Sequence, residues 1–244
     1  MMEGVLTMIT ISERREHESA KGFVLRILID NIVNICLKPG EKLNEPELCE
    51  HLGVSRTPFR EAELELAQRK LIEVRPKIGT YVSKIDAELV EEVRHLRAVL
   101  ETELAGMACE ILTKQDLDRL WENVALWKMY IERTQEEKIF SLDKAFHKML
   151  YQMCGRPYWY ELVENLAPHF DRTTVLSFRC RPAETILDDH ISLLKAIEIK
   201  DVLAARAIAT KHMQRYTENL TAIRESFPQY FKLRIESPKG LCCF

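Results

Sequence analysis

The pattern of residue types along the chain changes near residue 85, and this change limits the possible folds more than any other feature of the sequence. Glycine and proline concentrate before residue 80, and the apolar segments between them are short. From Asp86 onward, apolar residues recur with the spacing of amphipathic helices, with short breaks such as "CGRP" and "FRCRP". We therefore expect a mainly α protein, with short elements over 1–84, an all-helical bundle of six or seven helices over 85–233, and a tail over 234–244.

Capping signals and the short breaks set the expected helices of the second part. The stretch "LTKQD" offers a capping box, in which Thr113 precedes the helix and Asp116 follows three residues later. The expected helices cover roughly 87–109, 114–134, 137–154, 157–178, 182–199 and 201–225.

Composition excludes several classes of protein. A chain of 244 residues can form two domains, and its net charge of −3 excludes a strongly basic nucleic-acid binder, although a local basic patch remains compatible with it. No window has the apolar length of a transmembrane helix, and the N-terminus lacks the pattern of a secretory signal. Seven scattered cysteines without C-x-x-C spacing favour reduced thiols, so we expect a cytoplasmic protein.

The first part has the element order of a winged helix-turn-helix. The amphipathic run "FVLRILIDNIVNICL" ends at the Pro-Gly pair of "KPGEKL", and "NEPELCEHLG" carries a capping box of Asn44 and Glu47 with Gly53 as its stop. The stretch "VSRTPFREAELELAQRKL" is expected to be a second short helix, capped by Ser55 or Thr57. The strand-like runs "LIEV" and "TYVSKI" flank "RPKIG", which predicts a hairpin.

Several residues of this part suit contacts with double-stranded DNA. The second helix of such a motif places its N-terminal residues against base edges in the major groove, where an arginine can donate two hydrogen bonds to guanine. Between residues 54 and 84, seven basic residues accompany four acidic ones. Two arginines alone would also fit an ordinary solvated surface, but the ordered series of elements favours DNA. The candidate DNA contacts are Ser55, Arg56, Thr57 and Arg60 on the helix, and Lys77 and Gly79 on the hairpin.

The segment "LKPGEKLNEPELCEHLGVSRTPFREAELELAQRKLIEVRPKIGTYV" closely resembles the DNA-binding domain of the GntR family of bacterial transcription regulators. The resemblance covers roughly residues 20–84, and the turn, recognition helix and wing fall in register. Three positions depart from the family pattern: Glu63 replaces a usual leucine, Lys70 a usual glycine, and Pro46 an arginine of some relatives. The resemblance implies a homodimer that binds a palindromic operator, and we expect a repressor.

Four acid–histidine pairs have the spacing of one helical turn, whereas chance would give about one. The histidines of three pairs lie on polar or charged surfaces, and we expect them to be exposed. These pairs are Glu13/His17, Glu47/His51 and Glu91/His95, and the fourth is Asp143/His147 in "LDKAFHKML".

Asp143 and His147 differ because they lie beside the apolar stripe of their helix. His190 and His212 lie within the apolar stripes of two later helices, so one carboxylate and three imidazoles are expected to point inward. A buried carboxylate without a partner is destabilising by several kcal/mol. Periodicity leaves two interpretations open: a hydrogen-bonded polar core, or a divalent metal bound by all four residues.

The segments "SLDKAFHKML", "DDHISLLKAI" and "ARAIATKHMQ" are similar to the ligand-bearing segments of the FCD-type ligand-sensing domain in the FadR-like branch of the same family. In that domain an aspartate, a histidine four residues on and two later histidines bind a metal within a helical bundle. The resemblance covers about residues 86–225 and implies a divalent transition metal, with zinc expected first and nickel or manganese as alternatives. Arg156 stands where many relatives have asparagine. The matching residues are Asp143, His147, His190 and His212.

Arg97 lies on the inward stripe of the helix expected at 87–109, with Glu101 one turn away. It could form a structural pair with Glu101, or bind the carboxylate of a ligand as a fork, and in "VRHLRAVLE" it also matches a pocket-facing arginine of related sensors. Four protein ligands can leave two positions open on a six-coordinate metal. A DNA-binding domain in the same chain favours a sensor of a small organic acid over the alternative, a metal-dependent hydrolase or isomerase.

Overall fold

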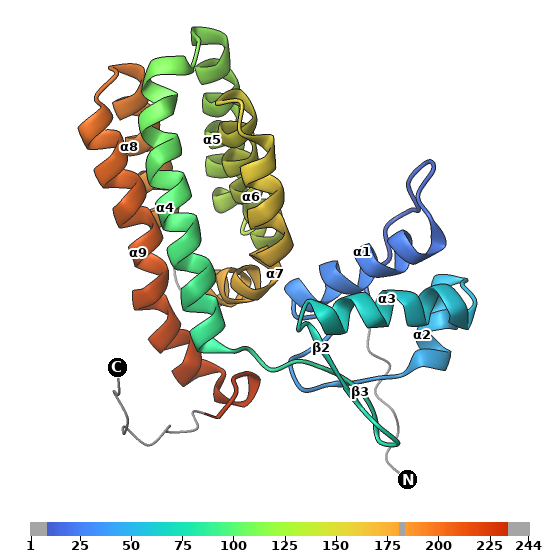
Figure 1. The fold of residues 1–244 in the computed structure, drawn as a ribbon. Coiled ribbons are helices and arrows are strands. Elements are labelled where there is room, and N and C mark those ends of the chain that lie inside the picture. The colour runs from blue at the N-terminus through green and yellow to red at the C-terminus, as the bar shows by residue number, and fades with distance from the viewer. Residues whose placement is uncertain (1–8, 181–183, 234–244) are drawn as a thin grey trace, which may run out of the picture.

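The structure of the protein is a computed structural model that describes residues 9–180 and 184–233. The expected tail over 234–244 lies outside these residues, as do the first two residues of the helix expected at 182–199. Within the described part, the chain folds into a winged helix-turn-helix followed by an all-helical bundle, so the mainly α fold is confirmed (Figure 1).

From residue 9 onward, where the structure is described, three helices form the first part. Helix α1 (Ala20–Val33) begins at Ser19, whose side chain accepts a hydrogen bond from a backbone N–H of the first turn. Helices α2 (Glu45–Leu52) and α3 (Arg56–Gln68) follow and are joined by a tight turn at Gly53, which has the left-handed φ of 62° that favours glycine. Helix α3 packs against both α1 and α2, and thereby presents its outer face to solvent.

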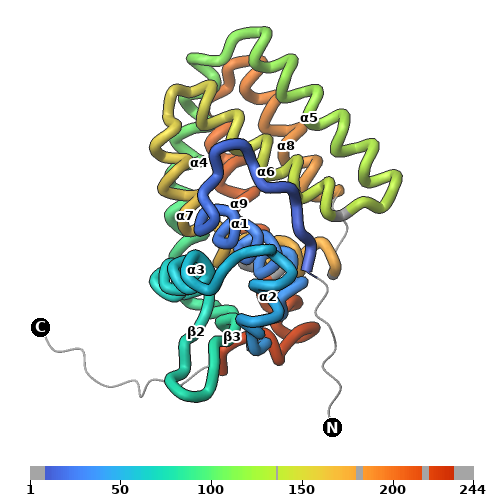
Figure 2. The backbone as a smooth tube through the Cα atoms, turned by 90° about the vertical axis from the view of Figure 1, so that its right-hand side faces the viewer, coloured from blue at the N-terminus to red at the C-terminus, as the bar shows by residue number. Residues whose placement is uncertain are grey.

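The wing is an antiparallel sheet in the order β1-β3-β2. Strands β2 (Ile72–Arg75) and β3 (Gly79–Val82) form the expected hairpin, which extends away from α3 (Figures 1 and 2). Strand β1 (Lys42–Leu43) pairs with β3 and was not expected, because two residues are too short to show an alternating pattern.

One detail of the expected capping is wrong. Asn44 is the N-cap of α2, but its side chain accepts no hydrogen bond from the helix backbone and instead donates to the Glu47 carboxylate. Ser55 is the N-cap of α3, also without a side-chain hydrogen bond to the helix. The start of α2 is therefore defined by its extended N-cap backbone and by Pro46 in the first turn, a position where a missing N–H has no consequence.

Among the residues that the structure describes, six α-helices form the second part, with boundaries close to those expected. The capping box of Thr113 and Asp116 is present at the start of α5, where each side chain bonds the other's backbone N–H. Helices α4 and α9 lie side by side along the bundle, and α5 packs on α6 and α8 (Figures 1 and 2). The helices are α4 (Ala87–Ile111), α5 (Lys114–Glu132), α6 (Glu136–Met153), α7 (Pro157–Cys180), α8 (Glu184–Glu198) and α9 (Val202–Ser226), and a short 3-10 helix, η1 (Pro228–Tyr230), follows.

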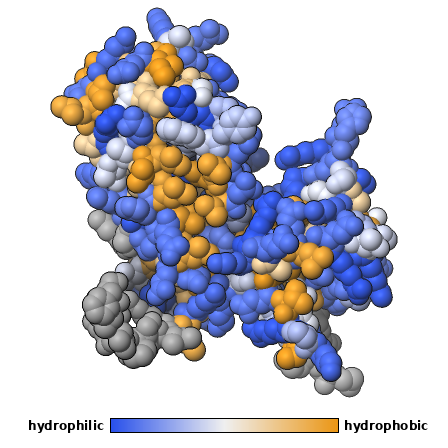
Figure 3. Space-filling model, in the orientation of Figure 1, coloured by the Kyte–Doolittle hydropathy of each residue, from blue (hydrophilic) through white to orange (hydrophobic). Residues whose placement is uncertain are grey.

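The buried apolar side chains form two clusters, one centred in the winged helix-turn-helix and one in the bundle. Val33 and Ile35, at the end of α1, belong to the bundle cluster. Phe59 and Leu66 of α3 belong to the first cluster, and Trp127 and Phe146 of the bundle to the second. No helix in the described ranges has the length and apolar character needed to cross a membrane. On one face of the bundle, apolar surface lies over α4 and α9 (Figure 3).

The segment after α9 returns to the linker between the two parts. The Ile85 N–H donates to the Tyr230 carbonyl at 2.8 Å, and the Lys232 N–H donates to the Ile85 carbonyl at 2.9 Å. The Lys232 ammonium also lies 3.1 Å from the Asp86 carboxylate at the start of α4. The linker is therefore bound on one side by residues from the far end of the described chain.

Candidate metal centre

Three helices bring one carboxylate and three imidazoles together inside the bundle. Asp143 and His147 come from α6, His190 from α8 and His212 from α9, and each is at most 5% exposed. Their potential ligand atoms all lie within 4.8 Å of one another. The structure thus assembles the four residues that the sequence singled out, in a cluster that could hold a metal ion.

The atoms facing the centre of this cluster lack hydrogen-bond partners. Asp143 Oδ1 lies 3.7 Å from His147 Nε2 and 3.6 Å from His190 Nε2, too far for hydrogen bonds. Among the described residues, none of these three atoms has another hydrogen-bond partner, and neither has His190 Nδ1. Because buried polar atoms are almost always satisfied, a divalent cation at their centre fits this set better than a closed hydrogen-bonded core does.

Two carboxylates orient the imidazoles from outside the cluster. Glu101 of α4 places Oε2 2.8 Å from His147 Nδ1, and Asp189 of α8 places Oδ2 3.4 Å from His212 Nδ1. Arg215 in turn donates two hydrogen bonds to Asp189. Such carboxylate contacts fix the ring and its tautomer, so both histidines would bind a metal through Nε2.

Sequence reasoning missed both of these contacts. Glu101 was considered only as a partner for Arg97, and Asp189 was not singled out although it directly precedes His190. Each contact joins two different helices, and helical periodicity carries no information about which residues of separate helices face one another.

Aromatic side chains surround His190. The Phe146 ring stacks on it with centroids 4.2 Å apart, and the Trp127 ring meets it edge-on at 4.8 Å. Burial, together with the charges of His212 and His147, lowers the pKa of His190 well below its usual value. This ring is therefore neutral, which is the form that binds a metal.

His147 has the opposite electrostatic environment. Burial opposes a positive charge on this ring, but the carboxylates of Glu101 and Asp143 outweigh burial and raise the pKa of His147 to about 9. Burial also opposes the charge of Glu101, yet Arg97 and His147 together lower its pKa below the usual range. In the metal-free protein at neutral pH, His147 is thus protonated and paired with an ionised Glu101.

Metal binding should consequently release about one proton per subunit at pH 7, because His147 must lose its proton to become a ligand. The apparent zinc affinity should rise by roughly tenfold per pH unit from pH 7 to about pH 9, where His147 loses its proton without metal. Titration calorimetry of metal-stripped protein with zinc, in buffers of different ionisation enthalpy, measures the number of protons released. The exposed-histidine variant His95→Ala should give the same number, and a value near zero for both proteins would contradict a protonated His147.

Arg97 is bound to Glu101 in this structure. Its Nε and Nη2 donate to Glu101 Oε1 at 3.0 and 2.8 Å, and its guanidinium lies 4.6 Å above the centroid of the Phe170 ring. The structural pair considered from the sequence is therefore present. Because Glu101 also contacts His147, the Glu101 side chain connects Arg97 to the candidate metal centre.

The candidate DNA contacts lie on two exposed elements. Ser55, Arg56, Thr57 and Arg60 are exposed at the start of α3, and Lys77 and Gly79 lie at the end of the β2–β3 hairpin. Arg60 Nε donates to the Glu45 carboxylate of α2 at 3.1 Å, a surface contact of small energy that DNA could replace. The six residues thus form two patches, one on the helix and one on the wing.

Two of the departures from the family pattern have a local explanation. Lys70 follows α3 with a φ of 58°, the left-handed conformation that a glycine would adopt more easily. Glu63 is buried, burial raises its pKa, and its side chain bonds to that of Thr80 on β3. Both residues therefore fit the winged fold without changing its elements.

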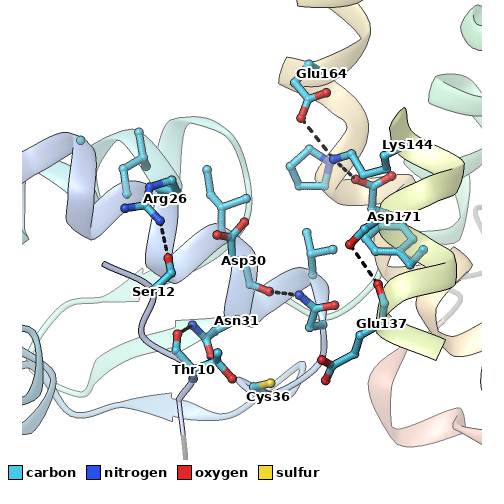
Figure 4. Close-up of a pocket in the computed structure, with 18 of the residues that line it drawn as sticks. Thr10, Ser12, Arg26, Asp30, Asn31, Cys36, Glu137, Lys144, Glu164 and Asp171 are labelled. Carbon is cyan, nitrogen blue, oxygen red and sulfur yellow. Dashed lines mark hydrogen bonds and ion pairs between the residues drawn. The ribbon is translucent and has the colours of Figure 1, made fainter. Parts of the chain in front are cut away.

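One crevice lies away from the four clustered residues. It has a volume of about 670 Å³ and lies between α1 and the helices α6 and α7. Figure 4 shows Arg26 and Asp30 on one side of it, and Lys144, Glu164 and Asp171 on the other. Its walls carry both signs of charge, and the crevice marks the boundary between the two parts of the chain.

Comparisons with known proteins match both parts. Residues 21–82 match the bacterial regulatory proteins of the gntR family, and residues 92–215 match the FCD domain. The HTH-type transcriptional repressor RspR of Escherichia coli (strain K12) is 32% identical over 209 residues, covering 85% of this chain and 92% of RspR. The gluconate operon transcriptional repressor of Bacillus licheniformis is 29% identical over 179 residues, covering 70% of this chain and 72% of that protein. The structure of E. coli McbR/YncC has a TM-score of 0.72 at 27% identity, covering 86% of this chain and 99% of that chain.

Proposed function

This chain belongs to the GntR family of bacterial regulatory proteins and carries an FCD domain. We propose that it is a repressor whose affinity for DNA changes when a small organic acid binds. Its relatives are HTH-type transcription regulators, so the chain is a transcription regulator and not an enzyme. We propose that it acts in the cytoplasm as a homodimer on a palindromic operator. The proposed limits are 1–84 for the DNA-binding domain, 85–233 for the sensing domain and 234–244 for a tail.

The buried cluster of Asp143, His147, His190 and His212 carries this proposal. Its inward-facing nitrogen and oxygen atoms suit a divalent transition metal, for which we favour zinc over nickel or manganese. When bound, the metal would supply a Lewis-acidic centre with up to two positions open to a ligand. Small carboxylates are natural ligands for such positions, and a gluconate operon repressor among the relatives supports a carboxylate effector.

Arg97 is the residue we propose for the other end of the effector. Arg97 is 6% exposed, and it is linked to His147 through Glu101. An effector carboxylate that competes with Glu101 for Arg97 would also alter the contact between Glu101 and His147. Effector binding at the metal would in this way also change the contacts of α4. This helix follows the wing after the short linker and could transmit the change to the DNA-binding part.

The apolar face of the bundle supports the homodimer. Leu96 and Val99 of α4 are 39% and 58% exposed, and Leu203 of α9 is 83% exposed. Apolar surface also lies over α4 and α9 on one face of the bundle (Figure 3), and contiguous exposed apolar surface is typical of protein–protein contacts. We propose that a second copy of the chain covers this face.

Arg97→Lys should weaken the response to the true effector by roughly 10- to 100-fold, because lysine keeps the charge but loses the two-pronged hydrogen bond. The measurement is a thermal-shift screen of zinc-loaded protein against hydroxy acids, dicarboxylates and sugar acids, followed by DNA binding with each hit. Arg94→Lys is the matched control, since Arg94 lies one turn earlier on α4 and pairs with Glu91 instead.

Two outcomes would decide against this proposal. Equal responses of wild type and Arg97→Lys to every acid would remove the role of Arg97. If no acid shifted the wild type, while an acyl-coenzyme A or a neutral sugar did, the carboxylate-at-metal proposal would be wrong as a whole.

A further inference from the structure

Helix α7 contains a long buried stretch that is unusually polar. All residues from 167 to 178 are buried, although a helix buried on every side is normally apolar throughout. Helix α7 packs against α1, α4, α6 and α9. We call its residues 167–179 the junction segment. Its buried polar residues are His169, Asp171, Arg172, Thr173, Thr174 and Ser177.

Three side chains of the junction segment bind main-chain carbonyls of the winged helix-turn-helix and its linker. His169 Nε2 lies 2.8 Å from the Arg69 carbonyl, which ends α3, and Arg179 Nη2 donates to the Asn34 carbonyl, which ends α1, at 3.0 Å. Burial and the charge of Arg172 lower the pKa of His169 to about 4, so its neutral ring donates through Nε2–H. Carbonyls at helix C-termini carry partial negative charge and lack partners within the helix, so both are good acceptors.

Arg172 makes the third of these contacts and is the most buried. It is 1% exposed, and its Nη1 donates to the Ser83 carbonyl at 2.7 Å, directly after strand β3. Within the described ranges no carboxylate is hydrogen-bonded to Arg172, although the charge of Asp86 acts on it through space, and its Nε has no hydrogen-bond partner. A buried cation that is hydrogen-bonded only to a carbonyl contributes little to the free energy of folding. We therefore look for the role of Arg172 in the position of the linker that it binds.

The junction segment also contacts residues that lie beside the candidate metal centre. Phe170 lies under the Arg97 guanidinium at 4.6 Å, and Asp171 accepts a hydrogen bond from Lys144, the neighbour of Asp143, at 2.9 Å. Figure 4 shows Lys144 and Asp171 meeting across the crevice from Asp30 of α1. One stretch of α7 therefore contacts both the sensing site and the DNA-binding part.

We propose that Arg172, assisted by His169 and Arg179, is a positioning residue for operator recognition. Its hydrogen bond to Ser83 fixes the direction in which the linker leaves the wing, and so fixes the recognition helix relative to the bundle. In a homodimer this orientation sets the distance between the two recognition helices, and hence the half-site spacing that the protein accepts. The inference rests on the proposed homodimeric DNA binding, but its structural core concerns a single chain.

The experiment compares the full-length variants Arg172→Met and Arg172→Lys with wild type. Methionine fills the space without a donor, whereas lysine can still donate to the Ser83 carbonyl. Operators selected by wild type from a random DNA pool are rebuilt with their half-sites moved apart by about 5 base pairs, half a helical turn. Wild type and Arg172→Lys should lose affinity for the altered spacing on the order of 100-fold, and Arg172→Met should lose only a few-fold. All variants should bind a single half-site equally.

Small-angle X-ray scattering without DNA provides a second readout. Arg172→Met should be more extended than wild type, Arg172→Lys should match wild type, and Arg119→Met, at an exposed position of α5, is the control. An unchanged spacing preference and an unchanged scattering curve for Arg172→Met would overturn the proposal. If that variant does not fold, Arg179→Met decides, because Arg179 is exposed, and an unchanged spacing preference there overturns it as well. If wild type selects no DNA, the proposed function fails, and scattering alone tests the positioning role.

Discussion

His190→Ala should abolish stable metal binding and lower the midpoint of thermal unfolding of the metal-loaded protein by roughly 10–35 °C. Removing one of four ligands should reduce metal affinity on the order of 100-fold or more. A ligand at 1,000 times its dissociation constant stabilises the native state by about 4 kcal/mol, and a buried cavity adds a loss of about 2–5 kcal/mol. For a chain of this size, each kcal/mol corresponds to about 2–4 °C. Calorimetric unfolding and elemental analysis of both proteins measure the effect.

The metal-free proteins make this test specific. With metal removed by a chelator, wild type and His190→Ala should differ only by the cavity loss of about 2–5 kcal/mol, because neither nitrogen of His190 has a hydrogen-bond partner among the described residues. His95→Ala is the matched control on an exposed surface of α4 and should leave both the metal content and the unfolding midpoint unchanged. If wild type contained no metal and gained no stability from zinc, nickel or manganese, the metal site would be rejected and only the hydrogen-bonded polar core would remain as an interpretation of the four residues.

Arg56→Ala and Arg60→Ala should each weaken operator binding by about 1–3 kcal/mol and relax the preference for individual bases. Both side chains are exposed at the start of α3, the end of a recognition helix that enters the major groove. Arg60 must also leave Glu45 to reach DNA, so Glu45→Gln should increase affinity slightly. The measurement is the ratio of the affinity for operator DNA to the affinity for random DNA, both determined at one fixed salt concentration.

The control for these arginines is Arg119→Ala, which removes the same charge from an exposed position on α5. It should leave the ratio of specific to random binding unchanged. If Arg56→Ala and Arg60→Ala behaved like Arg119→Ala, the assignment of α3 as the recognition helix would fail.

The helices could be predicted from the sequence because their signals are local. Thr113 with Asp116 at the start of α5, and Gly53 at the end of α2, act within one turn of the residues they define. The inward positions of Asp143 and His190 were equally predictable, because an apolar stripe identifies the buried face of a helix without reference to its neighbours.

Contacts between elements could not be predicted in this way. The bond between Glu101 and His147 joins α4 to α6, and His169 of α7 binds a carbonyl of α3 that lies 100 positions away. Main-chain carbonyl acceptors leave no signature in the sequence, since every residue has one. For this reason the polar stretch of α7 looks like a solvated helix surface until the two parts of the chain are placed together.

The pairing of the linker with the last described residues has a consequence for synthesis. Asp86 emerges from the ribosome 146 positions before Lys232, to which it binds. At a translation rate of roughly 5–20 residues per second, the linker waits on the order of ten seconds for this partner. During that interval the DNA-binding part can form its own apolar core, but it cannot take up its final direction. In the homodimer proposed above, a prematurely terminated chain would therefore carry a recognition helix that contacts one half-site, and only the full-length chain would hold two recognition helices at a fixed separation.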